Sequence, residues 1–352
     1  MAGLIEFSPA AGGLHLHTLA TPRCGGTGEL SLVSDGGEMR YPELRYVLES
    51  EDPSLSFETR DLVVKVIDNS GLRLKADSSR ESYFGKYGTN SPLPFSHHLG
   101  YHGIRTLYSK AERRNLVIPY GSWLNLQTVQ FSGIQNDPVD ERAWSGVGRG
   151  WPIELERAGK GARLTLDPLP QTQFKYSLEL QPAEPDGVDF TVSFVFHRRA
   201  VHGPSRLRAT WPCYVNSYTD VRFFYPRGES VDEWQWDALA EPLTSVLGDP
   251  VGYRHEQMVY SVAEQALPLG YGLIGDRALV MMFDDSHIRF FVVNAGGHMP
   301  YSTVQNPAWD FEWVVEDYPL NEPVGFRGRL AYMPFSGPDE ILARYHAWVE
   351  DL

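Results

Sequence analysis

Apolar and polar residues alternate through most of the chain, and a period of two is the pattern of a β-strand with one buried face. In the segment 188–199, every second residue from Phe190 to Phe196 is large and apolar, so these side chains share one face. Comparable segments recur, and each of them predicts a strand. They span residues 61–68, 72–77, 114–120, 124–131, 162–169, 175–182, 277–285, 288–297, 311–317 and 325–335.

Short polar connections predict how some of these strands pair. The letters NSG separate 61–68 from 72–77, and Gly71 can supply the positive φ of a tight turn. We therefore expect these two segments to form a hairpin. The segments 114–120 and 124–131 are expected to form a second pair.

One further connection is short enough to predict a tight turn. The strands 277–285 and 288–297 are separated by two residues, and we expect a turn around Ser286 to join them.

Helical patterns are few. The clearest begins near Pro338, which suits a first helical turn, and Asp339 and Glu340 favour the positive end of a helix dipole. A short helix is also expected within 230–247, where Pro242 would break it. The apolar face of the C-terminal helix, expected to pack on a sheet, comprises Ile341, Leu342, Tyr345, Trp348, Val349 and Leu352.

Many strands, few helices and no βαβ alternation predict an all-β fold, a large antiparallel β-sandwich with a C-terminal helix. The composition agrees, with 12% aromatic residues, 33 Gly and 25 Pro, which suit short strands joined by tight connections. No repeat of fixed period and no linker composition occurs. We expect one domain over residues 1–352, with a possible small N-terminal β subregion over 1–60.

Charge narrows the possible partners. The net charge of −14 disfavours nucleic acid, because a phosphate backbone needs a basic surface. No apolar run approaches the roughly 20 residues that span a membrane, and no leader pattern is visible, so a cytoplasmic protein is expected. Cys24 and Cys213 form no metal or disulfide motif. No cofactor is assigned.

A histidine-rich loop is the first candidate for chemistry. The segment 95–108, FSHHLGYHGIRTLY, holds His98 and His102 four residues apart, with Tyr101 and Arg105 beside them. Histidines titrate near neutrality and can serve as acid and base in one pocket. On a helix this spacing would suit zinc, but the flanking Pro and Gly residues argue against a helix, so no metal ligand is assigned. Surface or structural histidines are the alternative.

The segment 306–317, NPAWDFEWVVED, is the second candidate. On a strand its aromatic residues face one way, and Asp310 and Glu312 face the other, roughly 7 Å apart at the backbone. Paired carboxylates are the acid and base of many sugar enzymes. The alternative is an amphipathic strand whose acidic face lies in water.

Further residues of suitable chemistry are scattered along the sequence. Glu256 follows a histidine, and His298 follows a Gly-Gly pair in a loop after a strong strand, where catalytic residues tend to occur. Aromatic and amide side chains that could stack on sugar rings or bind hydroxyls are Trp123, Trp211 and Asn216.

The C-terminal part of the chain resembles a known group of proteins. The segments GLIGDRALVMMFDDSHIRFFVVNAGG, AWDFEWVVEDYPLNEPVGFRGRLAYMPF and EILARYHAW resemble the galactose-mutarotase-like, or supersandwich, carbohydrate-active proteins of bacteria. The resemblance covers about the last two-thirds of the chain. It implies a large antiparallel sandwich whose concave sheet binds sugars. Aldose epimerases of that group use a histidine acid and a glutamate base, which implies His98 or His102 with Glu256 or Glu312.

These observations lead to several hypotheses of function. The favoured one is a carbohydrate-active enzyme of the epimerase or mutarotase type that uses His/carboxylate acid–base chemistry on a small or oligosaccharide sugar. A glycoside hydrolase would use carboxylates, and a lyase would need a cation such as Arg105 to neutralise a uronate. Two further hypotheses are a carbohydrate-binding protein without catalysis and a metalloenzyme with histidine ligands.

Overall fold

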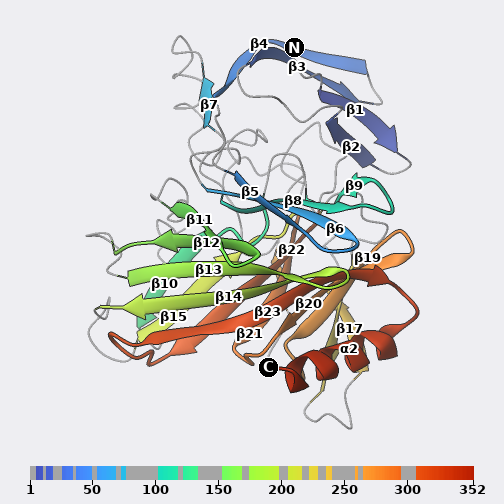
Figure 1. The fold of residues 1–352 in the computed structure, drawn as a ribbon. Coiled ribbons are helices and arrows are strands. Elements are labelled where there is room, and N and C mark those ends of the chain that lie inside the picture. The colour runs from blue at the N-terminus through green and yellow to red at the C-terminus, as the bar shows by residue number, and fades with distance from the viewer. Residues whose placement is uncertain are drawn as a thin grey trace.

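A computed structural model describes the chain over residues 5–10, 13–18, 26–34, 37–49, 54–68, 73–76, 102–117, 122–133, 153–168, 174–197, 205–215, 222–228, 235–239, 258–260, 265–294 and 307–352 (Figure 1). For residues 5–49 and 73–76, only the course of the strands is described. The regular elements within these segments are antiparallel strands and a C-terminal helix. The predicted all-β fold is therefore confirmed.

The larger of two facing sheets has nine strands in the described residues, and every neighbouring pair is antiparallel. In spatial order the strands are β11 (Glu154–Ala158), β12 (Gly161–Leu166), β13 (Phe174–Ala183), β14 (Gly187–Phe196), β23 (Pro323–Pro334), β20 (Arg277–Phe283), β19 (Leu269–Ile274), β16 (Phe223–Arg227) and β17 (Gln235–Leu239).

The facing sheet has five strands in the described residues and lies behind the first in Figure 1. Its order is β10 (Thr128–Gly133), β15 (Ser205–Trp211), β22 (Pro307–Glu316), β21 (Ile288–Asn294) and β18 (Met258–Tyr260). Two antiparallel sheets that face each other make a sandwich, as the sequence predicts.

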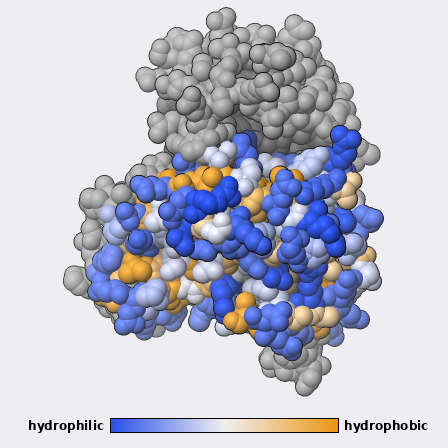
Figure 2. All heavy atoms as spheres, in the orientation of Figure 1, coloured by the Kyte–Doolittle hydropathy of each residue, from blue (hydrophilic) through white to orange (hydrophobic). Residues whose placement is uncertain are grey.

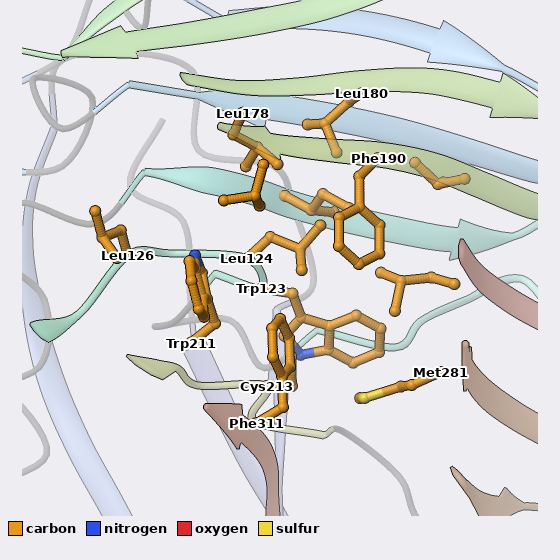
Figure 3. Close-up of a cluster of buried hydrophobic side chains, with 14 of the residues drawn as sticks. Trp123, Leu124, Leu126, Leu178, Leu180, Phe190, Trp211, Cys213, Met281 and Phe311 are labelled. Atoms are coloured by element: carbon orange, nitrogen blue, oxygen red, sulfur yellow. The ribbon is translucent and has the colours of Figure 1, made fainter. Parts of the chain in front are cut away.

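Aromatic side chains fill the space between these two sheets. Phe194 of the nine-stranded sheet stacks on Trp313 of the five-stranded sheet, with ring centroids 5.9 Å apart. Trp211 stacks on Phe311 at 5.2 Å within the five-stranded sheet. Figure 3 shows these two rings in the core close to Trp123. Buried aromatic pairs of this kind stabilise a core beyond the area that they bury.

A third sheet contributes to the same core. Its strands are β5 (Ser54–Glu58), β6 (Leu62–Ile67), β8 (Gly103–Ser109) and β9 (Arg114–Asn115). The predicted hairpin of 61–68 with 72–77 is wrong, because β6 pairs with β5 and β8 while β7 (Arg73–Ala76) pairs with β4 (Gly37–Glu49). A glycine turn signal is local, whereas the partner of β6 is decided by the apolar side chains that it buries. The buried ones are Leu62, Val64, Val66 and Ile67.

The second predicted pair, 114–120 with 124–131, is also wrong. Strand β9 pairs with β8, and β10 pairs with β15. Leu124 adopts a φ of 57°, which breaks an extended strand at that residue. Leu124 instead lies fully buried in the core.

The short turn around Ser286 carries the chain from one sheet to the other. Strand β20 belongs to the nine-stranded sheet and β21 to the five-stranded sheet, so residues 284–287 form a corner between the layers. Asp285 holds this corner, since its carboxylate accepts hydrogen bonds from the His287 N–H at 2.8 Å and from Trp313 Nε1 at 2.8 Å.

The C-terminal helix α2 (Pro338–Glu350) covers part of the outer face of the nine-stranded sheet. Ile341, Tyr345 and Trp348 pack with residues of β19, β20 and β23 in a second apolar cluster, which confirms the predicted docking. Val349 and Leu352 are 39% and 44% exposed, so the apolar face is narrower than expected.

The expected helix within 230–247 is wrong where it can be checked. Residues Gln235–Leu239 form the edge strand β17, which pairs with β16 over five residues, from Phe223↔Leu239 to Arg227↔Gln235. Trp236 packs beside Tyr271 there, so tertiary contacts override the helical pattern.

The rest of the outer face of the nine-stranded sheet is polar. Figure 2 shows mostly hydrophilic residues over this side. Arg163 pairs with Glu179, and Arg329 pairs with Asp189, so ion pairs run across neighbouring strands. This surface keeps one side of the sheet in water, as is common for antiparallel sheets.

The N-terminal strands form two small sheets. Strand β1 (Ile5–Ala10) pairs with β2 (Gly13–Thr18), and β3 (Gly26–Ser34) pairs with β4, which also pairs with β7. The single domain over 1–352 and the subregion over 1–60 both stay predictions.

A buried ion pair between α2 and the β13–β14 turn yields a stability prediction. Both terminal nitrogens of Arg344 donate to Asp186, which is 4% exposed. Arg344→Met leaves that carboxylate buried without its cation, so we expect the free energy of unfolding to fall by about 3 kcal/mol. Urea unfolding followed by Trp fluorescence measures the loss.

The matched control is Arg60→Met, which breaks the exposed Arg60–Asp61 pair. This change should cost less than about 1 kcal/mol. Equal losses of unfolding free energy in the two variants would contradict the conclusion that Asp186 is a buried carboxylate that needs Arg344 as its partner.

Candidate functional site

Strand β22 carries the two predicted carboxylates on the outer face of the five-stranded sheet. Trp309, Phe311 and Trp313 point into the core, and the alternation of the strand turns Asp310 and Glu312 the other way. This division of the faces is confirmed. The acidic face does not lie in water, however, because Asp310 and Glu312 are only 5% and 4% exposed.

Glu312 lies between two neighbouring strands that both supply polar partners. In the strand register it is opposite Thr210 on β15 and Arg289 on β21. The Nε of Arg208 donates to Glu312 Oε2 at 2.5 Å, and the Arg208 side chain is 19% exposed. This charge-assisted bond pairs Glu312 with a guanidinium group in a mostly buried place.

Asp310 has different surroundings. Its Oδ1 accepts a hydrogen bond from the Cys213 N–H at 2.7 Å, and the apolar Phe291 is its register partner on β21. Burial raises the pKa of Asp310 to about 8, and the Cys213 N–H offsets only part of that rise. Asp310 is therefore largely a neutral acid at pH 7.

His102 lies at the start of β8, fully buried beside the core. Its Nε2 accepts a hydrogen bond from the Leu126 N–H at 3.0 Å, and its backbone N–H donates to Asn125 Oδ1 at 3.2 Å. Burial alone lowers the pKa of His102 to about 3, so the ring is neutral at pH 7. A proton-transfer role on a substrate stays a prediction for His102, and this buried position gives it no support.

The predicted sugar-stacking rings lie in the core. Trp123 and Trp211 have no exposed surface, and Trp123 Nε1 donates to the Tyr214 carbonyl at 2.6 Å (Figure 3). Neither ring offers a face to a ligand in this structure. Arg105 lies half-buried on β8. The structure does not describe the other predicted site residues, which are His98, Tyr101, Asn216, Glu256 and His298.

The sequence reasoning missed the basic partner of the carboxylate pair. Arg208 and Thr210 stand at alternate positions of β15, in SRLRATW, opposite the apolar Leu207, Ala209 and Trp211. That alternation already indicated a polar outer face. It could not indicate that β15 is the neighbour of β22, because the two strands are about a hundred residues apart.

Two further findings bear on the metalloenzyme hypothesis and on a membrane location. Among the residues that the structure describes, no three His, Cys, Asp or Glu side chains gather where they could hold a metal ion. In the same part of the chain, no helix has the length and apolar character needed to cross a membrane.

Comparisons with known proteins find similarity among solved structures. No protein-family model and no curated protein matches the sequence. Among solved structures, the chain is similar to the GalM/aldose epimerase homologue from C. elegans, with a TM-score of 0.39 and 9% sequence identity over 81% of this chain and 100% of that chain. The case for a function therefore depends on the residues of this chain.

The protonated state of Asp310 yields a pH-dependent stability. The unfolded carboxyl ionises near pH 4, whereas the folded one keeps its proton up to pH 8, so stability falls as pH rises between these values. From pH 6.5 to 8, Asp310 alone should remove about 2 kcal/mol from the free energy of unfolding. Asp310→Asn should abolish this loss.

Urea unfolding at several pH values tests this effect. Asp189→Asn makes the same chemical change on the exposed outer face of the nine-stranded sheet, and it should keep the wild-type slope. The same slope in wild type and Asp310→Asn would show that Asp310 is ionised throughout.

Proposed function

We propose that this protein is a carbohydrate-active enzyme that uses acid–base chemistry at the outer face of its five-stranded sheet, with an epimerase or mutarotase type of reaction. The substrate class comes from the sequence resemblance to galactose-mutarotase-like proteins. The chemistry comes from the carboxylates of β22, and a small or oligosaccharide sugar is the proposed partner.

One observation carries the proposal, namely that Asp310 and Glu312 share a buried face but differ in their surroundings. Asp310 is kept protonated by burial, and Glu312 is paired with Arg208. Two neighbouring carboxyl groups whose environments separate their protonation states are the usual arrangement of a general acid and a general base. A carboxylate pair that served only solubility would have no reason to be buried.

The roles follow from these states. Asp310 donates its proton to the ring oxygen of the sugar while Glu312 takes the proton of the anomeric hydroxyl. The bond between the ring oxygen and the anomeric carbon then breaks, which gives the open-chain aldehyde. Rotation of the aldehyde and the reverse transfers close the ring with the opposite configuration. Arg208 pairs with Glu312 and orients its carboxyl group.

Residues from elsewhere in the chain complete the proposed site. The resemblance to galactose-mutarotase-like proteins implies a histidine acid, and His98 and His298 stay candidates for proton transfer at this site. Glu256 stays a candidate base, and Tyr101, Asn216 and Arg105 stay candidates for binding sugar hydroxyls. Asp310 and Glu312 come first in the tests because their surroundings are described.

A panel of substrates with two variants tests the proposal. Mutarotation of free aldoses is followed by polarimetry or NMR, and release of aryl groups from aryl glycosides is followed by absorbance. Asp310→Asn and Glu312→Gln should each lower kcat by roughly 100-fold or more, since a positioned acid or base contributes about that much. Glycoside cleavage with no mutarotation would favour the glycoside hydrolase hypothesis.

The matched control is Glu179→Gln, which removes a carboxylate paired with Arg163 on the outer face of the nine-stranded sheet. This variant should keep full activity. Circular dichroism checks that both β22 variants are folded. Unchanged rates in both folded variants would overturn the roles of Asp310 and Glu312.

The pH profile supplies a second test. An acid with a pKa of about 8 is lost as pH rises through that value, so kcat/KM should fall tenfold per pH unit above about 8. Asp310→Asn should have a low rate without this alkaline limb. An alkaline limb that persists in Asp310→Asn would assign the acid to another residue, with His98 and His298 tested next by substitution.

A further inference from the structure

Four buried polar side chains are linked by pairwise contacts within the core. His102 and Asn125 come from the segments around β8, Tyr176 comes from β13 and Trp211 from β15. The rings of His102 and Tyr176 form an edge contact with centroids 6.4 Å apart. The indole N–H of Trp211 approaches the Tyr176 hydroxyl closely enough to oppose the rise of the Tyr176 pKa on burial. This group is called the core polar cluster below.

Each member of the core polar cluster has a buried polar atom without a hydrogen-bond partner in the described residues. These atoms are His102 Nδ1, Asn125 Nδ2, Tyr176 OH and Trp211 Nε1. Buried polar atoms in folded proteins almost always have a protein or water partner, so four unpartnered atoms on residues in contact need an explanation.

The count of donors and acceptors defines the missing partner. His102 Nε2 accepts from the Leu126 N–H, so the proton of the neutral ring resides on Nδ1. Asn125 Nδ2 and Trp211 Nε1 are donors only. The Tyr176 hydroxyl is the acceptor among these four atoms, and its two lone pairs can take the Trp211 N–H and at most one further donor.

We propose that the core polar cluster binds an internal water molecule, which accepts hydrogen bonds from His102 Nδ1 and Asn125 Nδ2. An oxygen with two lone pairs supplies the acceptors that these donors lack. The guest is neutral, because the two side chains that hold it, neutral His102 and Asn125, carry no charge to balance an ion. An anion would have no charge to balance it in this dry interior.

The water has a structural consequence for the histidine-rich loop. His102 already binds the segment 122–126 at three points, because the Ser122 hydroxyl donates to the His102 carbonyl at 2.6 Å in addition to the two bonds described above. The water adds a hydrogen bond at His102 Nδ1, the second nitrogen of the ring. The water therefore joins His102 to Asn125 a second time, which is a positioning role for His102.

Solution NMR of the full chain with ¹⁵N-labelled histidine tests the proposal. We expect one histidine with a protonated Nδ1, an unprotonated Nε2 and a slowly exchanging Nδ1–H that shows a cross-peak to a long-lived water. Asn125→Leu removes one of the two donors that hold the water, and it should abolish the cross-peak. Ser122→Ala, which alters only the bond to the His102 carbonyl, should keep it.

A high-resolution crystal structure of the unaltered chain decides the matter if Asn125→Leu fails to fold. Electron density for a water within hydrogen-bond distance of both His102 Nδ1 and Asn125 Nδ2 is expected. A protein acceptor on both atoms, or a His102 ring protonated at Nε2 instead, would overturn the proposal. These readouts do not depend on sugar chemistry, so their failure is distinguishable from failure of the proposed function.

Discussion

The packing of three aromatic side chains of β22 against the nine-stranded sheet is the constraint on which the rest depends. Trp313 stacks on Phe194, and Phe311 packs at 4.7 Å from Phe283. Trp309 fills the space over Gly272, where a Cβ would lie 2.2 Å from the ring. A slip of one residue would turn these rings outward, and it would force Asp310 and Glu312 into the core.

The position of the carboxylates is thus a consequence of core packing, and their chemistry is a consequence of their burial. Removing a carboxylate from water costs several kcal/mol unless it is paired or protonated. The two residues meet this cost in different ways, since Glu312 gains the guanidinium of Arg208 and Asp310 keeps its proton. Stability and acid–base asymmetry therefore have the same origin at this face.

The sequence predicts the strands better than their partners. The alternation of apolar and polar residues predicted β14, β22 and β23 and the two faces of β22, because apolar residues occupy the buried face of each strand. Pairing failed for β6 and for β10, since partners are chosen by long-range packing that no turn residue records. The burial of the acidic face of β22 was equally invisible, because polar residues on a strand normally indicate water and the basic partner, Arg208, is distant in sequence.

Strand β15 explains why the two carboxylates differ. Its sequence continues through Pro212, which lacks an N–H and ends the regular ladder. Just beyond, the Cys213 carbonyl accepts from the Trp309 N–H at 3.1 Å, while the Cys213 N–H turns to the side chain of Asp310. A neutral donor just beyond the end of β15 therefore orients Asp310, whereas the middle of the strand supplies Arg208 as the partner of Glu312. A neutral donor orients a carboxyl group but lowers its pKa less than a neighbouring cation would. The four residues between Arg208 and Cys213 thus separate a carboxyl group paired with a guanidinium from one held by a neutral donor, which a symmetric pair of arginines on β15 could not do.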